Sequence, residues 1–522
     1  MKSTPSKSYR HRAISFMMMP FTLTSGDDYG LADFALPEGT CWQPAKMGVD
    51  CGVFLSHIQR FLQASVSEHV RRKYAPAGDY HLRDCDYHIY SVDPKAVVHR
   101  HVLTQQLMVP LDQGTAFTIG TRPTSFLSPK LVVCPNAAVG LLMLPFMPML
   151  GDHPDIKQLV RFNYLLHKTD GQSCRISVDA SPDNRRYRKA CRRGDIDYAG
   201  SDQKLAEALG VDCDSDTGRV WFTMSHLLAA LMRGIAHSRF NDDMLHVFSY
   251  IELDPEVFAA DTAIRYHFTR LAMCISDRYR VTNEQVDQVM RPGSFENVYM
   301  SSTTSGGAIM TVVGDNSPQY LKEFATGSLQ PRYLWIYVMM LMQRHSLLNI
   351  TNWVIDIDID RDGDGDRDVN HTLERVRRAV RRMSELTVNN RFSSVSDYTQ
   401  HNNFYHQCCD VLGIDTLHAE VEQKLNILGD LAEQLSTERK EQVDASKEFW
   451  QAALAVIVAV LTMFSATNDG VDAMVKMGLS EQAVPWATVI LLAIIFGLGL
   501  WLVGLRFIRL YGQHKTEKRK PK

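Results

Sequence analysis

The sequence lacks the features that mark several common classes of protein. Its 522 residues include ten cysteines but no pair of CxxC motifs, and a chain of this length can bury a sizeable core without disulfides. Acidic and basic side chains number 59 and 56, for a formal net charge of -3. Because dedicated binders of DNA or RNA normally carry a clear basic excess, we expect no direct contact with nucleic acid.

Motifs of established catalytic sites are also missing. The sequence contains no GxSxG elbow, P-loop, HExxH or complete dinucleotide fingerprint. It has no convincing signal peptide either, because the short apolar run after the basic N-terminus stops at Pro20 without a small-residue cleavage site. We therefore expect a non-enzymatic protein with a reduced, cytosolic head, and a membrane-anchored cytosolic enzyme stays the alternative.

Long apolar runs are absent from the first 440 residues, whereas the last 75 contain two. Residues 449–467 carry no charge, and residues 484–507 form a longer run with Trp486 and Trp501 toward its ends. As helices rising 1.5 Å per residue, both runs can cross about 30 Å of hydrocarbon. The sequence therefore predicts two transmembrane helices.

The charges that flank the two runs predict their orientation. Residues 468–483 contain three acidic side chains and one lysine, and the tail at 508–522 is basic. Because lysine and arginine concentrate on the cytoplasmic side, residues 468–483 are predicted to form an external loop. We expect a multi-pass protein of the cell inner (plasma) membrane with both termini cytoplasmic.

A charged segment at residues 414–448 precedes the first apolar run. Apolar residues recur there at steps of three and four and give one stripe on a polar helix: Ile414, Leu417, Val421, Leu425, Leu428, Ala432 and Leu435. We predict a long stalk helix that continues into the first membrane helix. A narrow stripe of this kind usually packs against another apolar surface. Self-association of several copies would cover the stripe and enclose a pore. The predicted pore lining is Asn468, Ser465, Leu461, Val458, Leu454 and Gln451.

This order of head, stalk, membrane helix, acidic loop, second membrane helix and basic tail resembles the CorA-type ion channels over about residues 415–522. Members usually carry Gly-Met-Asn at the outer end of the first membrane helix, where this chain has Ala466-Thr467-Asn468. The resemblance implies a homo-oligomer, with a pentamer as the expected form and Asn468 at the pore mouth. It also makes Mg²⁺ or another divalent cation a candidate permeant or regulatory ion, with no other cofactor expected.

Three sequence segments of the head resemble a subgroup of CorA-like proteins found beside type III CRISPR systems: residues 131–146, 301–310 and 333–350. This resemblance implies an antiviral effector switched by a nucleotide second messenger, which in that subgroup can be a conjugate of S-adenosylmethionine with AMP (SAM-AMP). A divalent cation (Mg²⁺) transporter is a further alternative.

The head, residues 1–413, is predicted to be an α/β domain with a mixed sheet flanked by helices. Residues 80–146 show the alternation of short strands, including two apolar runs joined at the Pro135-Asn136 turn. Residues 333–350 form a long apolar segment, but Arg344 and His345 interrupt it, which favours a core helix over a membrane span.

Candidate ligand-binding residues in the head are polar, basic or glycine positions. Arginine forks suit phosphate oxygens, and glycine lets backbone amides approach a ligand. The candidates are Asn136, Gly140, Arg161, Asn163, Ser305, Gly306, Arg185 and Arg186. A solvated loop explains the 185–193 arginines equally well, and an ordinary turn explains the glycines.

Two clusters contain residue types that bind metals. Residues 81–101 hold His81, Cys85, His88, His99 and His101, but their spacing matches no established zinc site. Asp358, Asp360, Asp362 and Gly363 fit the first six positions of a calcium loop, although Val369 stands where the bidentate glutamate belongs. Ordinary histidines and an exposed charge network are the competing interpretations.

Overall fold

The computed structural model describes a mixed α/β domain and part of the helix that follows it. The residues it describes are 12–24, 36–45, 54–55, 58, 87–111, 114–120, 126–151, 154–169, 174–179, 201–211, 213–214, 219–241, 243–293, 295–324, 331–355, 374–381, 383 and 392–430, with scattered positions between 433 and 458. The chain divides into two units, one of residues 1–364 and 370–428 and one of residues 365–369 and 429–522.

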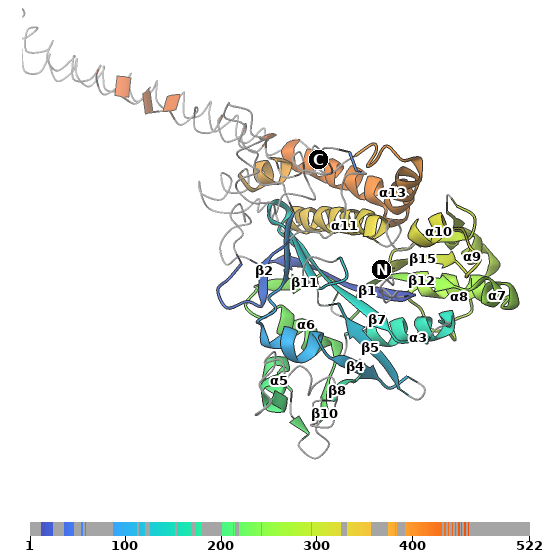
Figure 1. Ribbon diagram of the computed structural model, residues 1–522. Helices are drawn as coiled ribbons and strands as arrows, with labels where there is room; N and C mark the ends of the chain where they lie inside the picture. Colours follow the sequence, from blue (N-terminus) through green and yellow to red (C-terminus); the bar gives the residue numbers. More distant parts are fainter. Residues whose placement is uncertain are drawn as a thin grey trace, which may run out of the picture. The chain divides into compact units, whose positions relative to one another are not determined.

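The described strands of the first unit form one sheet (Figure 1). The strands of its main path are, in spatial order, β13 (Arg291–Pro292), β14 (Val298–Ser302), β15 (Gly306–Val312), β12 (His246–Leu253), β1 (Ala13–Leu23), β7 (Val139–Pro148), β5 (Thr115–Ile119), β4 (Gln106–Val109), β8 (Ile176–Asp179), β10 (Arg219–Phe222) and β9 (Cys213–Asp214). A branch runs from β7 through β6 (Lys130–Cys134) and β3 (His88–Val92) to β2 (Trp42–Pro44), and β11 (His237–Arg239) pairs with β1.

The sheet is mixed, as the sequence predicts. β12 and β15 run parallel, whereas the other paired strands run antiparallel. The two apolar runs around Pro135 are β6 and β7, joined by the short helix η3 (Pro135–Ala137). The apolar run that ends near Pro20 is β1, a central strand whose residues are buried on both faces. A strand that is covered on both faces has a continuously apolar sequence, and this explains why the β1 sequence resembles a short signal sequence.

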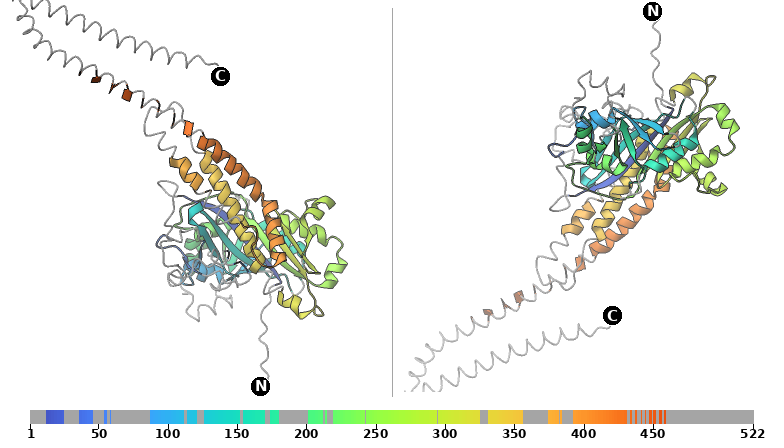
Figure 2. Two further views of the ribbon diagram at one scale, coloured as in Figure 1. Left: turned by 90° about the horizontal axis from the view of Figure 1, so that it is seen from above. Right: turned by 90° about the horizontal axis from the view of Figure 1, so that it is seen from below.

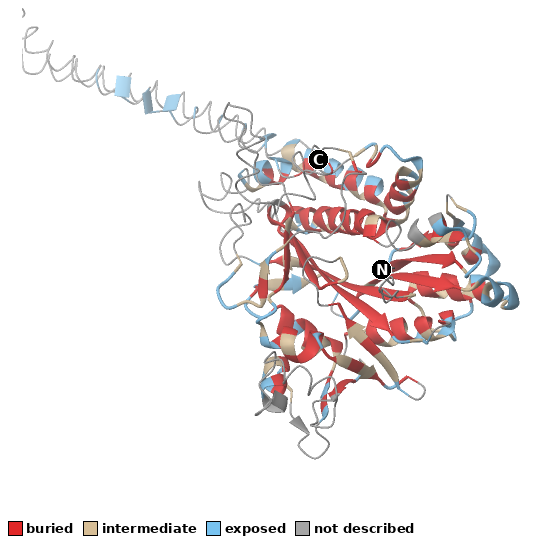
Figure 3. Ribbon diagram, in the orientation of Figure 1, coloured by how far each residue is buried: buried red, intermediate tan, exposed pale blue. Residues whose placement is uncertain are grey.

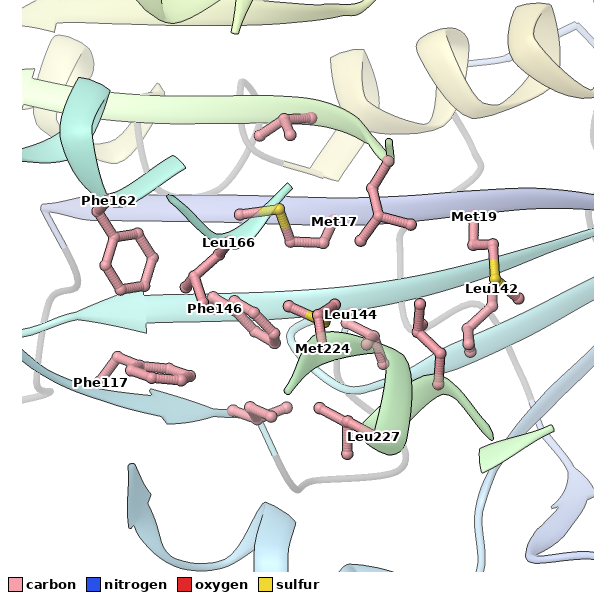
Figure 4. Packing of buried hydrophobic residues seen from close by; sticks show 14 of the residues in the cluster. Met17, Met19, Phe117, Leu142, Leu144, Phe146, Phe162, Leu166, Met224 and Leu227 are labelled. Atoms are coloured by element: carbon pink, nitrogen blue, oxygen red, sulfur yellow. The ribbon is translucent and has the colours of Figure 1, made fainter. Parts of the chain in front are cut away.

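Helices cover both faces of the sheet (Figures 1 and 3). The first face, called here the α8 face, lies under α3 (Ile156–Leu166), α6 (Met224–Leu231) and α8 (Ile264–Met273). Figure 4 shows its packing, in which the Phe117 ring of β5 lies against the rings of Phe146 on β7 and Phe162 on α3, with Met17 and Leu144 in the same cluster. The remaining helices of the domain include α5 (Ser201–Leu209), α7 (Pro255–Ala260), α9 (Asn283–Val289), α10 (Gln319–Phe324) and the π-helix η2 (His99–Leu103).

The second face, called here the α11 face, lies under α11 (Leu334–Ile355) and α13 (Thr399–Leu412), which lie side by side (Figure 2). α11 is buried around most of its circumference because the sheet covers one side and α13 another. A helix that is apolar all round is expected in such a middle layer. This is the core helix predicted at residues 333–350.

Residues 414–430 are also helical. Ile414, Val421 and Leu425 are buried in the core of the α11 face, and Leu417 and Leu428 pack against its edge. This part of the apolar stripe is therefore covered by its own chain. The described positions from Glu433 to Val458 are helical as well, and Ala432 and Leu435 lie outside the described residues.

The prediction of two transmembrane helices needs correction. Within the part of the chain that the structure describes, no helix is both long and apolar enough to cross a bilayer. This finding contradicts the membrane helices at 449–467 and 484–507, the membrane-protein and ion-channel assignment, and the multi-pass inner-membrane location. Apolar length is necessary for a membrane span but does not establish one, because a buried helix such as α11 has the same all-round apolar character. Most of 449–467 and all of 484–507 lie outside the described residues.

Candidate ligand site at the end of helix α8

The C-terminal end of α8 joins three segments that are distant in the sequence. α8 ends at Met273, and the next residue, Cys274, is buried in the left-handed conformation with φ 51°, where its N–H bonds to the carbonyls of Arg270 and Leu271. This sharp ending turns residues 275–280 back along the helix, where Tyr279 O accepts a hydrogen bond from Arg270 Nε at 2.9 Å. The helix end thus carries a short basic loop at the margin of the sheet.

Helix α3 reaches this loop through an ion pair. Arg161 Nε donates a 2.7 Å hydrogen bond to Asp277 Oδ2, and both side chains are partly exposed. The bond holds the pKa of Asp277 below its usual value. Arg161, a predicted ligand residue, therefore lies at the α8 loop, bonded to Asp277 and partly exposed.

The turn between β14 and β15 reaches the same helix end. Thr303 Oγ1 donates to Ala272 O at 2.8 Å, and Gly306 N–H donates to Thr303 Oγ1 at 3.2 Å. A Cβ atom at Gly306 would lie 2.1 Å from Val247 O, so the close approach to β12 requires glycine. Thr304 and Ser305 are left exposed at the tip. We call Arg161, residues 272–280 and the turn 303–306 the α8 rim.

The charge of the α8 rim is positive. Its residues include three arginines, Arg161, Arg278 and Arg280, against the single carboxylate of Asp277. Arg278, Tyr279 and Arg280 are exposed, Tyr279 by 48%. Arginine binds phosphate oxygens through a planar fork, and an exposed tyrosine offers a face for stacking a base. The rim therefore has the chemistry to bind a small anion that carries an aromatic group.

A row of buried polar residues lies on the α8 face of the sheet. Asn163 Nδ2 of α3 donates to Ser249 Oγ at 2.7 Å, and Ser249 lies 3.3 Å from Ser15 Oγ on β1. In the strand register the small residue Ala308 of β15 separates this row from Ser301, the next buried serine on β14. Asn163, also a predicted ligand residue, is 1% exposed, so its role in the described state is to anchor α3 to the sheet.

The strand residue just before the turn 303–306 faces the helices on the other side of the sheet. Ser302 precedes it, and successive strand residues point to opposite faces, so Ser302 points toward α13, which contacts β14. Burial raises the pKa of the Cys408 thiol of α13, and the neighbouring Ser302 side chain acts in the opposite direction. Cys408 in turn raises the pKa of Tyr337 on α11, where burial is the larger cause. The strand that leads into this turn thus also packs against α13.

The other predicted ligand residues lie elsewhere. Gly140 pairs with Phe21, six residues along β1 from Ser15, which places it about 20 Å from the polar row. A Cβ at Gly140 would lie 2.2 Å from the Phe21 ring, so packing explains this glycine. Asn136 is in η3, beside Ala137, whose carbonyl bonds to Asn349 of α11. Arg185 and Arg186 lie outside the described residues.

The predicted pore residues belong to the second unit. Gln451, Leu454 and Val458 are exposed on a helix and line an open apolar groove with Trp450 and Ala455. Leu461, Ser465 and Asn468 lie outside the described residues. Among the described residues there is no group of three or more histidine, cysteine, aspartate or glutamate side chains that could hold a metal. His81, Cys85 and the aspartate-rich segment 356–368 are not among them.

Sequence reasoning did not single out Asp277, Arg278, Tyr279 or Arg280. The Arg-Tyr-Arg order carries no motif, and its relation to residues 161 and 303–306 depends on how α8 ends. Comparisons with family models, curated proteins and solved structures found no match to this chain.

Proposed function

We propose that the domain described here, up to residue 428, is a sensor for a small anionic ligand of the nucleotide class. The α8 rim binds the ligand, and α13 with the helix after it carries the response toward the C-terminal residues. The SAM-AMP conjugate implied by the family resemblance is the first ligand to test. The observation that carries the proposal is the position of the turn 303–306, which bonds to the end of α8 within the basic rim and directly follows β14, the strand that contacts α13.

The ligand class follows from the side chains of the rim. The exposed guanidinium groups of Arg278 and Arg280 would donate hydrogen bonds to phosphate oxygens of the ligand, and a purine would stack on the Tyr279 ring. The carbonyls at the end of α8 repel anions because the helix dipole is negative there. Thr303 reduces this repulsion, since its hydroxyl bonds to Ala272 O.

The response requires two arrangements of α13 that bind the ligand differently. A ligand shifts an equilibrium only by its difference in affinity for the two states, and about 5.5 kcal/mol is needed to move a population from 1:99 to 99:1. Rotation of the turn 303–306 would move Ser302 against Cys408, and α13 would have to repack against α11.

Equilibrium binding to the full-length protein tests the proposal. SAM-AMP, ATP, AMP and S-adenosylmethionine are titrated into wild type, into Arg278→Gln with Arg280→Gln, and into Arg265→Gln. Arg265 is the matched control because it is an exposed arginine of α8 that is paired with Asp287 at 3.0 Å. We expect at least one nucleotide to bind, with the double variant weakened at least about tenfold, or about 1.4 kcal/mol, and the control unchanged.

Equal binding by the double variant would remove the rim as the site, and no binding by any of the four probes would reject the nucleotide proposal. Chromatography of the same mixtures separates a sensor from an enzyme. A sensor leaves the ligand intact, whereas steady conversion of one probe would favour the enzymatic alternative.

A further inference from the structure

The junction between α13 and the helix after it contains a second arrangement that the ligand site does not involve. α13 ends at Leu412, and Gly413 follows in the left-handed conformation with φ 65°. Gly413 N–H bonds to the carbonyls of Cys409 and Asp410, and Leu417 N–H bonds to Gly413 O. The chain thus breaks one helix and starts another within one residue. Such a residue is where two helices change their relative direction most easily.

A side chain of α11 holds this junction. Arg344 Nη1 donates a 2.5 Å hydrogen bond to Leu412 O, one of the carbonyls that the helix end leaves without a helical partner. A cation at a helix C-terminus also interacts favourably with the helix dipole. The bond ties the end of α13 to the buried middle layer of the domain.

Two neutral histidines lie beside Arg344. His345, the next residue of α11, has its ring centroid 5.5 Å from that of His246 on β12, and the Phe240 ring packs against it at 4.6 Å. His345 Nδ1 donates to Leu341 O at 2.8 Å, and no hydrogen-bond partner meets the buried His246 Nδ1 in the described part of the chain. Burial is the main reason that the pKa of His246 falls to about 4 and that of His345 to about 3, and Arg344 lowers both further.

The other ionisable groups on the packed elements do not neutralise a proton on this pair. They include Tyr337 on α11, His418 in the helix that follows α13, Tyr250 and Glu252 on β12, and six side chains of α13, namely His401, Tyr405, His406, Cys408, Cys409 and Asp410. Asp410 is exposed, and His418 faces Glu422 at 3.9 Å. Arg344, His246 and His345 are all positively charged when protonated, and they lie together where Arg344 bonds to the end of α13.

We propose that Arg344 is a latch on the Leu412–Gly413 junction and that the neutral His246–His345 pair makes release of this latch proton-linked. With both imidazoles neutral, Arg344 stays on Leu412 O, and α13 and the helix after it move as one body. Opening the junction brings solvent to the imidazoles, which then take up protons, so acid favours the open state. The latch does not depend on the α8 rim, and its test uses no ligand.

Hydrogen exchange of the full-length protein, followed by mass spectrometry, tests the latch. At pH 7 we expect Arg344→Met to speed exchange of the amides at 413–417 at least about tenfold after correction for intrinsic rates. Exchange in β12 and β15 stays unchanged, which also shows that the variant is folded. Arg233→Met is the matched control, because Arg233 also donates to a backbone carbonyl, that of Ala208 at 3.1 Å. Arg344→Lys keeps the charge with a shorter reach and serves as a milder variant if Arg344→Met does not fold.

Proton linkage is tested by repeating the wild-type measurement at pH 5. Full exposure of His246 on opening gives a ceiling of about 30-fold in favour of the open state at pH 5, from pKa values of 4 closed and 6.5 open. We expect corrected exchange at 413–417 to rise at least about threefold from pH 7 to pH 5 in wild type, and not in His246→Phe with His345→Phe. Unchanged exchange in both Arg344 variants would overturn the latch, and an equal rise in wild type and the double-histidine variant would overturn the linkage.

Discussion

Helices bury both faces of the sheet, but the two faces differ in their buried polar residues. Under α3, α6 and α8, the buried polar groups include the neutral side chains of Ser15, Asn163 and Ser249, which lie in one hydrogen-bonded row, and His267 of α8. Under α11 and α13, the buried polar groups include ionisable side chains held neutral by burial, among them His246, His345 and His401. Burial also lowers the pKa of His267, but it lowers the pKa values of the α11-face histidines much further, so the stability of the α11 face depends more strongly on charge state. This difference suits an α11 face that can rearrange.

Matched truncations on the two faces are expected to have the largest effects. Leu144 on the α8 face and Leu341 on the α11 face are both 0% exposed. Leu144→Ala and Leu341→Ala should each lower the free energy of unfolding by about 2–5 kcal/mol, because each removes apolar contacts and leaves a cavity. Chemical denaturation measures the loss, with the half-exposed Tyr398→Ala as control. A loss below about 1 kcal/mol at either leucine would show that its face is not packed as described.

Acid is expected to act on the α11 face next most strongly. The unfolded chain protonates histidine near pH 6.5, whereas the pKa values of His246 and His401 in the fold are about 4. Between these values the unfolded state binds more protons, so stability falls as the pH falls from 6.5 toward 4. Each imidazole should contribute a loss of about 2 kcal/mol at pH 5 relative to pH 7. Urea unfolding at several pH values measures the slope, and His401→Phe should reduce it by about one proton; an unchanged slope would contradict the assignment.

Two tyrosine substitutions within the α11 face give the smallest expected effects. The hydroxyl of Tyr337 is buried without a hydrogen-bond partner among the described residues, whereas that of Tyr250 lies 3.0 Å from Thr311 Oγ1. Tyr337→Phe should therefore leave the free energy of unfolding within about 0.5 kcal/mol of wild type or raise it, whereas Tyr250→Phe should lower it by about 1 kcal/mol. The same denaturation assay compares them. A larger loss in Tyr337→Phe than in Tyr250→Phe would mean that the Tyr337 hydroxyl is bonded.

The sequence predicts features that depend on local patterns. Alternation and the Pro135 turn identify β6 and β7, and the charges of Arg344 and His345 identify α11 as a core helix. The apolar stripe after Ile414 also corresponds to buried residues. In each case a few neighbouring residues contain the signal, because helix and strand periods are local.

Features that depend on distant segments were not predictable in this way. The pairing of β12 with β15 joins strands more than 50 residues apart, and the α8 rim exists because Arg161, Asp277 and Thr303 meet at one helix end. Local composition also gave a wrong prediction, because the length of the apolar runs alone indicated membrane helices that the described residues do not contain. Whether an apolar helix is covered by protein depends on its tertiary neighbours.

The central claim is that ligand binding at the α8 rim changes the packing of α13. Hydrogen exchange of the full-length protein with and without a nucleotide that binds it tests this claim most directly. The account predicts slower exchange at 272–280 and 303–306 and, in the same sample, altered exchange at 404–417. Protection confined to the rim, with exchange at 404–417 identical in both samples, would contradict it.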